Sequence, residues 1–230
     1  MGYLRWMFEG TDNLNRQVIL DCSPPRPGGT VLDLGCGDGS FTRQLGARIG
    51  AARVMGVEFM DYQAAAAERN GVEVTRASLA EVLPFEDASI DVIHSNQVIE
   101  HLAGTDLFMR EICRLLRPGG YAIVSTNNLS SLHNIFALLL GWQPWANHVS
   151  DENVSLGNPI RPLGHLEPVA GRAHLRIFTG RALADLARHH GLRVELQRTV
   201  GFYPLPHWAA PVATRLLPLW GAYLVQRYAL

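Results

Sequence analysis

The chain has 230 residues, of which 47% are hydrophobic and 18% charged, a composition typical of a folded globular protein rather than a disordered segment. Its basic residues are 20 arginines and no lysine, which excludes a Schiff-base lysine, a lysine general base and the Gly-Lys-Ser/Thr phosphate loop. A formal net charge of −1 and the absence of any basic five-residue run argue against a nucleic-acid partner.

The cysteines and the N-terminus indicate the compartment. Cys22, Cys36 and Cys113 show no paired spacing, so neither a disulfide framework nor a zinc site is expected. The first residues lack the apolar segment of a signal peptide, and no apolar run is long enough to span a bilayer. We therefore expect a cytoplasmic protein without a transmembrane segment, whose contact with a membrane surface stays open.

Strand and helix patterns alternate through the first half of the chain. Residues 1–27 are predicted to form an N-terminal cap with a helix from Asp12 to Cys22. The predicted strands are 31–34, 53–58, 72–76, 90–95 and 121–126, and the predicted helices between them are 40–49, 62–70 and 105–116. This alternation predicts an α/β fold with a doubly wound, mostly parallel sheet covered on both faces.

The alternation stops after residue 126. Residues 127–177 form a long segment rich in Asn and Pro, which contains His133, His148, His165 and His174. A segment of this length between regular elements is usually functional, so we expect a lid-like insertion after the fifth strand. Regular patterns return with a helix at 180–190 and strands at 193–200 and 222–228. The whole chain is thus expected to be one domain, with a core at 28–126 and C-terminal elements at 178–230.

A glycine-rich turn follows the first predicted strand. Gly35, Gly37 and Gly39 stand between this strand and the next helix, where the backbone can approach a ligand and offer N–H groups to an anion. Glu58 ends the second strand, where a carboxylate can accept both hydroxyls of a ribose. The G-x-G-x-G spacing differs from the G-x-G-x-x-G of NAD-binding folds, so an NAD(P)-dependent oxidoreductase is the weaker alternative.

Further motifs give this turn a family context. They are 83–93 (LPFEDASIDVI), 95–102 (SNQVIEHL), 111–120 (EICRLLRPGG) and 174–179 (HLRIFT). Together with the glycine-rich turn they resemble the class I S-adenosylmethionine-dependent methyltransferases, in particular the branch that includes quinone-biosynthesis enzymes. The resemblance covers residues 28–126 closely and 172–200 more loosely. It implies a Rossmann-like, seven-stranded sheet with a reversed last strand, and S-adenosylmethionine as the cofactor.

The resemblance also implies which residues bind that cofactor. Asp33 and the backbone of the glycine-rich turn would hold the methionine part of the cofactor. Glu58 would bind the ribose, and Phe59 would flank the adenine. Ser78 and Leu79 stand where the family often has an aspartate for the adenine amino group. The implied cofactor-binding set is Asp33, Gly35, Cys36, Gly37, Gly39, Glu58, Phe59, Ser78, Leu79, Asn96 and Gln97.

Methyl transfer to an acceptor needs alignment and, for a protonated acceptor, a base. The candidates are His101, His148 and His174, although His101 can equally be a loop histidine that positions Glu100. No metal is expected, because the histidine spacings match no ligand pattern.

The insertion is the candidate for acceptor recognition. Trp145, with the apolar stretch 135–140, suits a hydrophobic acceptor, although that stretch can equally be a helix packed on the sheet. Arg161, Arg172 and Arg176 suit a carboxylate or phosphate, or lie solvated on the surface. The tail contains Trp208, Leu216, Leu217, Leu219 and Trp220, which either cover the sheet or contact a membrane or partner.

The sequence therefore predicts a methyltransferase acting on a small molecule. The candidate histidine bases favour transfer to an oxygen over transfer to carbon or nitrogen. A catalytically silent, cofactor-binding partner protein is a further alternative, and the chain is expected to be a monomer or a homodimer.

Overall fold

The computed structural model describes residues 3–150, 152–153, 156–160 and 173–230. Seven strands form one sheet in the order β3-β2-β1-β4-β5-β7-β6. The strands are β1 (Thr30–Leu34), β2 (Arg53–Val57), β3 (Glu73–Thr75), β4 (Ile90–Asn96), β5 (Leu116–Asn127), β6 (Arg193–Val200) and β7 (Tyr223–Ala229). Only β7 runs antiparallel to its neighbours, so the predicted mostly parallel sheet with a reversed last strand is confirmed.

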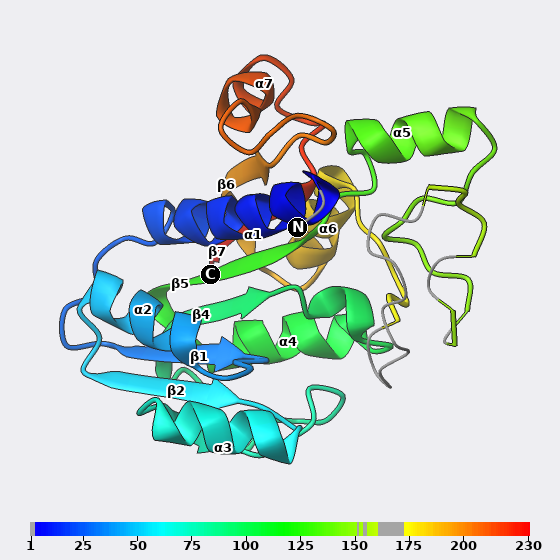
Figure 1. Cartoon of the computed structure of the whole chain (residues 1–230). Helices are drawn as coiled ribbons and strands as arrows, with labels where there is room; N and C mark the ends of the chain where they lie inside the picture. Colours follow the sequence, from blue (N-terminus) through cyan, green and yellow to red (C-terminus); the bar gives the residue numbers. More distant parts are fainter. Residues whose placement is uncertain (1–2, 151, 154–155, 161–172) are drawn as a thin grey trace.

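Helices cover both faces of this sheet (Figure 1). On one face lie α1 (Tyr3–Asp21), α2 (Ser40–Ile49) and α3 (Asp61–Arg69), and on the other α4 (Thr105–Leu115) and α6 (Gly180–His189). Successive residues of β1 point into the two hydrophobic layers on opposite faces of the sheet. Val31 belongs to the layer that contains Leu45 of α2, whereas Leu32 belongs to the layer that contains Phe108 of α4. Both faces of β1 are therefore buried, which explains why its apolar residues do not simply alternate with exposed polar ones.

The first helix starts at Tyr3 rather than at the predicted Asp12. Its first half is held by tertiary contacts, because Met7 is buried against Tyr203 and Ala222. Gly10 in this half packs so closely on His207 that a Cβ there would lie 2.3 Å from the ring. The prediction of a later start was wrong because helix propensity alone does not reveal these contacts.

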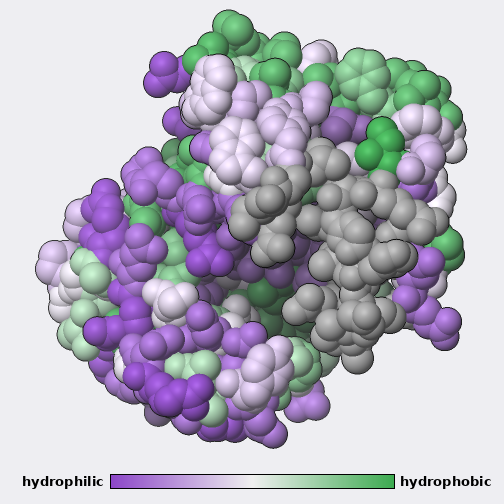
Figure 2. Space-filling model, viewed as in Figure 1, coloured by the Kyte–Doolittle hydropathy of each residue, from purple (hydrophilic) through white to green (hydrophobic). Residues whose placement is uncertain are grey.

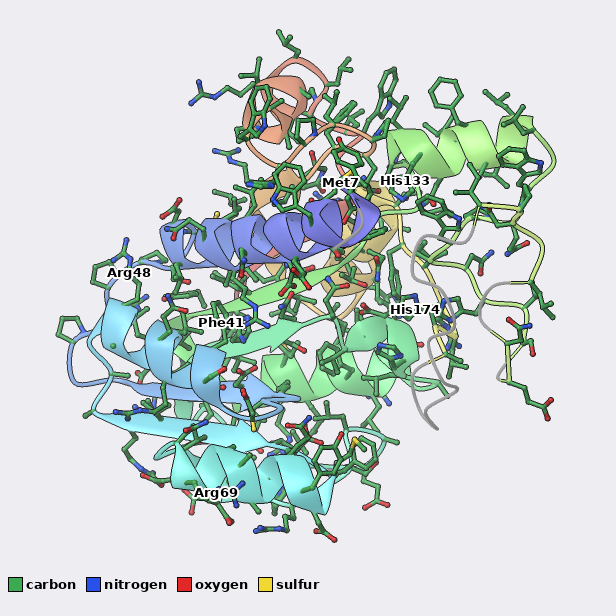
Figure 3. All side chains as sticks on the ribbon, viewed as in Figure 1. Met7, Phe41, Arg48, Arg69, His133 and His174 are labelled. Atoms are coloured by element: carbon green, nitrogen blue, oxygen red, sulfur yellow. The ribbon has the colours of Figure 1, made fainter. Side chains whose placement is uncertain are left out.

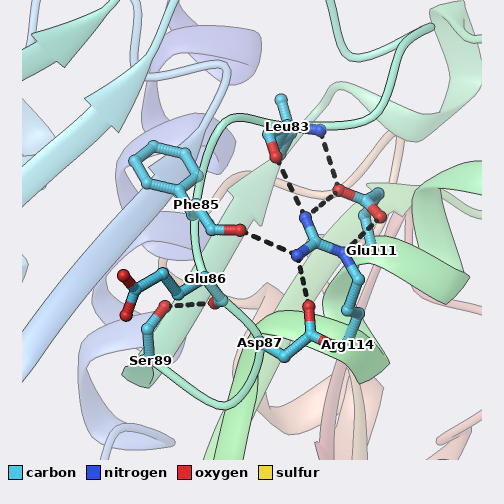
Figure 4. A network of polar contacts seen from close by, with 7 residues as sticks. All are labelled: Leu83, Phe85, Glu86, Asp87, Ser89, Glu111 and Arg114. Atoms are coloured by element: carbon cyan, nitrogen blue, oxygen red, sulfur yellow. Dashed lines mark hydrogen bonds and ion pairs between the residues drawn. The ribbon is translucent and has the colours of Figure 1, made fainter.

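Two of the sequence motifs contact each other through Arg114 of α4 (Figure 4). Its guanidinium donates to both carboxylate oxygens of Glu111, at 2.8 and 2.7 Å, and to Asp87 at 2.7 Å. It also donates to the carbonyl oxygens of Phe85 and Leu83, at 2.7 and 3.0 Å. The 111–120 motif therefore holds the 83–93 motif in place before β4, which is a structural rather than a catalytic task.

The insertion and the tail contribute α5 (Leu132–Leu139) and α7 (Ala210–Leu216). The alternative that the 135–140 stretch packs on the sheet is wrong for most of it, because Phe136, Leu138, Leu139 and Leu140 are exposed. The expectation that the tail covers the sheet is likewise wrong for its large apolar side chains, which are Trp208, Leu216, Leu217, Leu219 and Trp220. In the described parts of the chain, no helix is long and apolar enough to cross a membrane.

Candidate active site

The carboxyl ends of β1, β2, β4 and β5 point to the edge of the sheet where the insertion lies (Figure 1). In open α/β sheets this edge is where ligands bind. The glycine-rich turn, Glu58, Asn96 and Asn127 all follow or end these strands. The fold therefore gathers the predicted site residues at one edge.

The three glycines of the turn have different tasks. A Cβ on Gly35 would lie 2.6 Å from Val98, and a Cβ on Gly39 would lie 2.8 Å from Ala67, so both are needed for close packing. Gly37 has a φ of +54°, and a Cβ there would meet nothing within 4 Å. Gly37 is thus the one of these positions where a ligand can lie against the backbone.

Glu58 is tied to this turn. Its buried carboxylate accepts the N–H of Gly37 at 3.1 Å and the N–H of Met60 at 2.9 Å. A carboxylate offers about four lone-pair sites, so two remain for the hydroxyls of a ribose. Phe59 follows with its side chain 67% exposed, which leaves a ring face open for stacking.

Asp33 is buried beneath the turn. One carboxylate oxygen lies 2.7 Å from Nδ1 of His94 and the other accepts the hydroxyl of Thr42 at 2.5 Å. The side chain therefore joins β1, β4 and α2. Its implied contact with the methionine part of the cofactor stays a prediction.

The other predicted loop residues are held by the protein itself. Cys36 is buried against Gly56, and burial raises the pKa of its thiol to about 12, so the thiol stays protonated. Ser78 accepts the N–H of Ala80 at 3.2 Å, and Leu79 packs half-buried on the core. The side chains of Cys36 and Leu79 are therefore occupied by contacts within the protein.

Asn96 and Gln97 line the end of β4. The side-chain oxygen of Asn96 accepts from Asn15 of α1 at 3.0 Å, and that of Gln97 accepts from Asn127 at 2.9 Å. Gln97 has a φ of +57°, a strained conformation of the kind found at functional sites. Its buried Nε2 has no hydrogen-bond partner among the described residues. This orphaned donor fits a ligand placed over the end of β4.

The first helix closes this side of the site, which the sequence did not reveal. Asn15 is fully buried and also donates to Ser125 of β5 at 3.1 Å. Arg16 lies with its guanidinium 5.7 Å from the ring centre of Phe41 and pairs with Asp12 at 3.1 Å. A lone Asn and Arg in an amphipathic helix carry no sequence signal of this role.

The three predicted catalytic histidines meet in space. The rings of His101 and His174 have centroids 4.7 Å apart, and His148 stacks on His174 at 4.5 Å. Figure 3 shows His174 near the start of α4, which follows the short 3-10 turn Ile99–His101. Residues far apart in the chain therefore form one cluster beside the end of β4.

Hydrogen bonds set the tautomers of this cluster. Nδ1 of His101 lies 3.1 Å from the carbonyl of Ala173, and Nδ1 of His174 lies 2.8 Å from that of Ala146. A carbonyl can only accept, so both Nδ1 atoms carry the proton and both Nε2 atoms keep a lone pair. Burial lowers the pKa of His101, and it lowers the pKa of His174 to about 4. Both rings are neutral acceptors at pH 7. Burial also lowers the pKa of His148.

Glu100 completes the cluster, and the sequence singled it out only as a neighbour of His101. It is fully buried and accepts from Thr126 at 2.7 Å and from Asn127 at 3.2 Å. Burial raises its pKa to about 7. Because Asn127 also donates to Gln97, one hydrogen-bond network joins Glu100 to the end of β4.

An aromatic group lies beside the cluster. Trp145 has its ring centroid 5.9 Å from His133 of α5 and 6.3 Å from Phe8 of α1, and His133 lies 5.1 Å from Tyr203. Burial lowers the pKa of His133 to about 4, so its ring is uncharged. Of this group only Trp145 was predicted to bind the acceptor; Phe8 and Tyr203 come from segments that are distant from it in sequence.

The predicted arginines fall in different places. Arg176 donates to the carbonyl of Leu102 at 3.1 Å, and its backbone N–H donates to the carbonyl of Glu100. Arg161, Arg172 and His165 lie outside the described residues.

Two groups of side chains in the described residues bring ligand-type atoms within 4.8 Å of one another: Glu100 with His101 and His174, and Asp106 with His189 and His190. The sequence expectation of no metal stays a prediction.

Comparisons with known proteins point the same way as this geometry. A family model described as "Methyltransferase domain" matches residues 32–124. A Mycolicibacterium smegmatis protein named "Probable S-adenosylmethionine-dependent methyltransferase" is 35% identical, over 77% of this chain and 67% of its own length. A Mesorhizobium japonicum protein named "Ubiquinone biosynthesis O-methyltransferase" is 33% identical, over 67% of this chain and 62% of its own length.

Solved structures agree on the fold. An S-adenosylmethionine-dependent methyltransferase from Mesorhizobium loti superposes with a TM-score of 0.63 at 18% identity, covering 95% of this chain and 99% of that one. Curated relatives are often longer, since the chain spans 47%, 67% and 62% of three of them.

The open face at Gly37, the exposed ring of Phe59 and the orphaned donor of Gln97 fit the cofactor of that family. With the sheet order and the similarity over three quarters of its length, this chain belongs to the S-adenosylmethionine-dependent methyltransferase family.

Proposed function

We propose that the protein transfers a methyl group from S-adenosylmethionine to an oxygen atom of a small-molecule acceptor. The observation that carries this proposal is the cluster of Glu100, His101 and His174 beside the end of β4. When bound, the cofactor supplies an electrophilic methyl group on a sulfonium. The protein then has to align the acceptor and accept its proton.

The residues around the turn suit the cofactor's parts. Glu58 accepts the two ribose hydroxyls with its remaining lone pairs, and Phe59 stacks on the adenine. The Nε2 of Gln97 donates to the ligand at the end of β4. Asp33 acts through Thr42 and His94, which hold the turn on the sheet.

His101 is the base in this proposal. Its Nδ1–H is held by the Ala173 carbonyl, so Nε2 accepts the acceptor's proton while the ring keeps its orientation. The lowered pKa keeps this nitrogen free at neutral pH. Glu100, whose carboxylate lies within 4.8 Å of the histidine nitrogens and accepts from Thr126 and Asn127, helps to hold this cluster in place.

The acceptor is a flat, mainly apolar molecule that carries a hydroxyl or carboxyl group. The rings of Phe8, His133, Trp145 and Tyr203 support this class, since aromatic side chains favour stacked or edge contacts with other rings. The relative named for ubiquinone biosynthesis is an O-methyltransferase by its name, which supports oxygen as the target. Arg176, and by sequence Arg161 and Arg172, suit an anionic substituent.

The test uses S-adenosylmethionine with an isotopically labelled methyl group and a panel of hydroxylated aromatic acceptors, each paired with its amine analogue. Mass spectrometry is expected to find the label on oxygen together with S-adenosylhomocysteine. Label on nitrogen or carbon would refute O-methylation while keeping methyl transfer.

A second experiment tests the cofactor contacts by calorimetry with S-adenosylhomocysteine. Glu58→Ala is expected to weaken binding, whereas Glu73→Ala, on the exposed end of β3, is the matched control. Equal affinities in the two variants would contradict the ribose assignment.

A further inference from the structure

The connection between β6 and β7 is far longer than two antiparallel neighbours need. A hairpin usually takes about 2–5 residues, whereas here residues 201–222 intervene and contain α7. The start of the segment is buried, with Phe202 and Tyr203 at 4% exposure each, but residues 205–220 leave their large apolar side chains exposed: Trp208 is 72% exposed and Leu216 75% exposed. Val212 and Leu219 are exposed as well. Residues 205–220 therefore add apolar surface rather than core.

The helix α5 extends the same surface. Phe136, Leu138, Leu139 and Leu140 are exposed, with Leu139 at 75%. The two parts are joined, because Leu132 donates its N–H to the carbonyl of Trp220 at 3.0 Å. Figure 2 shows hydrophobic side chains gathered over α7 and α5 along one side of the molecule. We call this the α5/α7 surface, formed by the exposed apolar residues of 136–140 and 205–220. Exposed apolar surface of this extent marks an interaction site.

The sequences that form this surface carry one basic residue and no acidic one. Residues 127–150 contain no charged residue, and residues 201–222 contain Arg215 alone, in a chain that is 18% charged. Arg215 and Arg198 line a groove of about 590 Å³ between α1, β6 and α7, with Asp21 as the acid on its wall. Arginine binds phosphate oxygens through paired N–H donors. The surface thus combines apolar side chains with an arginine-bearing groove.

We propose that the α5/α7 surface docks on an anionic lipid bilayer. Exposed leucine, phenylalanine and tryptophan enter the headgroup boundary, and arginines attract the phosphates, which is the combination found on interfacial helices. The sequences that build this surface, 127–150 and 201–222, hold no carboxylate, so no acidic side chain in them repels an anionic headgroup.

Docking has a consequence for the site. The same helix α5 contributes His133 to the aromatic group of the acceptor side. The docked protein would therefore turn its acceptor side toward the bilayer. The docking itself does not depend on the proposed methyl transfer.

The test measures sedimentation of the full chain with vesicles of phosphatidylcholine, and of equal parts phosphatidylcholine and phosphatidylglycerol. The wild type is expected to partition onto both, more strongly onto the anionic vesicles, and less at high salt. Leu139→Asp combined with Leu216→Asp should lower the partition coefficient at least tenfold. Arg215→Gln should lower it about fivefold on anionic vesicles and leave it unchanged on neutral ones.

The matched control is Val82→Asp, which changes an apolar side chain that is 69% exposed in the loop between β3 and β4. It should bind vesicles like the wild type. Circular dichroism and affinity for S-adenosylhomocysteine should be unchanged in every variant, which separates loss of docking from loss of the fold.

Failure of the wild type to bind either vesicle overturns the proposal, as does equal binding by the double variant. Light scattering gives the third decisive result: a dimer that the double variant converts to a monomer would make this surface a contact between two copies of the chain.

Discussion

Replacing Gly37 by alanine is expected to lower the stability of the fold only modestly and to weaken cofactor binding strongly. The residue has a φ of +54°, and a Cβ there meets no protein atom within 4 Å. The new methyl group therefore causes backbone strain but no internal clash, and it projects into the space assigned to the cofactor. Gly28 provides a matched control, because its φ is +75° and a Cβ there also meets nothing within 4 Å, yet it lies before β1.

The magnitudes of the two effects differ. An L-residue in the left-handed region costs about 1–2 kcal/mol, and for a chain of this size each kcal/mol lowers Tm by about 2–4 °C. Both variants should therefore lose about 2–8 °C in Tm. Only Gly37→Ala should also weaken S-adenosylhomocysteine binding by more than about tenfold, which corresponds to about 1.4 kcal/mol.

Thermal unfolding followed by circular dichroism gives the first quantity, and isothermal titration calorimetry at a temperature where both variants are folded gives the second. If Gly37→Ala binds S-adenosylhomocysteine as tightly as Gly28→Ala does, the open face of the turn is not where the cofactor lies. If Gly37→Ala alone unfolds, the backbone argument is wrong.

Three further predictions concern the histidine cluster and the fold. His101→Ala should lower kcat by about 10²–10⁴-fold and leave the affinity for S-adenosylhomocysteine unchanged, whereas His189→Ala, at an exposed histidine, should change neither quantity. Because burial lowers the pKa of His101, the acid limb of the pH profile of kcat/KM should lie below pH 6.5. An acid limb above pH 6.5 would refute the assignment of His101 as the base. Burial raises the pKa of Glu100 from 4.5 to about 7, so its contribution to stability is present at low pH and lost as pH rises through 7. Urea unfolding of wild type and Glu100→Gln should thus diverge by on the order of 3 kcal/mol between pH 5 and 8, the wild type losing stability, and parallel curves would contradict this. Arg114→Met should cost about 2–4 kcal/mol in free energy of unfolding, because it leaves the buried carboxylate of Glu111 without its cationic partner. Arg53→Met breaks an exposed pair with Glu73 and should change the free energy of unfolding much less. Equal losses in the two variants would show that the network in Figure 4 is not stabilising.

Much of the sheet could be predicted because its strands carry local signals. The runs at 31–34 and 90–95 place apolar residues on both faces of the sheet, and the helix over Ser40–Ile49 was predicted with the bounds it has in the structure. Glu58, which directly follows β2, and the turn after β1 are likewise specified locally, since a strand, a glycine pattern and an acid suffice to predict them.

The rest of the site depends on contacts between distant segments. His101 meets His174 only because backbone N–H groups of Leu175 and Arg176 bind the carbonyl of Glu100, a pairing that no local pattern specifies. Phe8, His133 and Tyr203 are brought together near Trp145 in the same way. The early start of α1 also follows from tertiary packing.

The sequence alone determined the fold class and the family, because hydrophobic periodicity and glycine positions act within a few residues of where they stand. It also determined that, in a chain without lysine, arginine is the side chain that carries a permanent positive charge with which to bind an anion. Only the tertiary structure decided that Leu216 and Leu139 face outward. The hydrophobicity of a side chain gives only its free-energy preference for leaving water. Whether other residues cover that side chain depends on how distant segments of the chain pack around it.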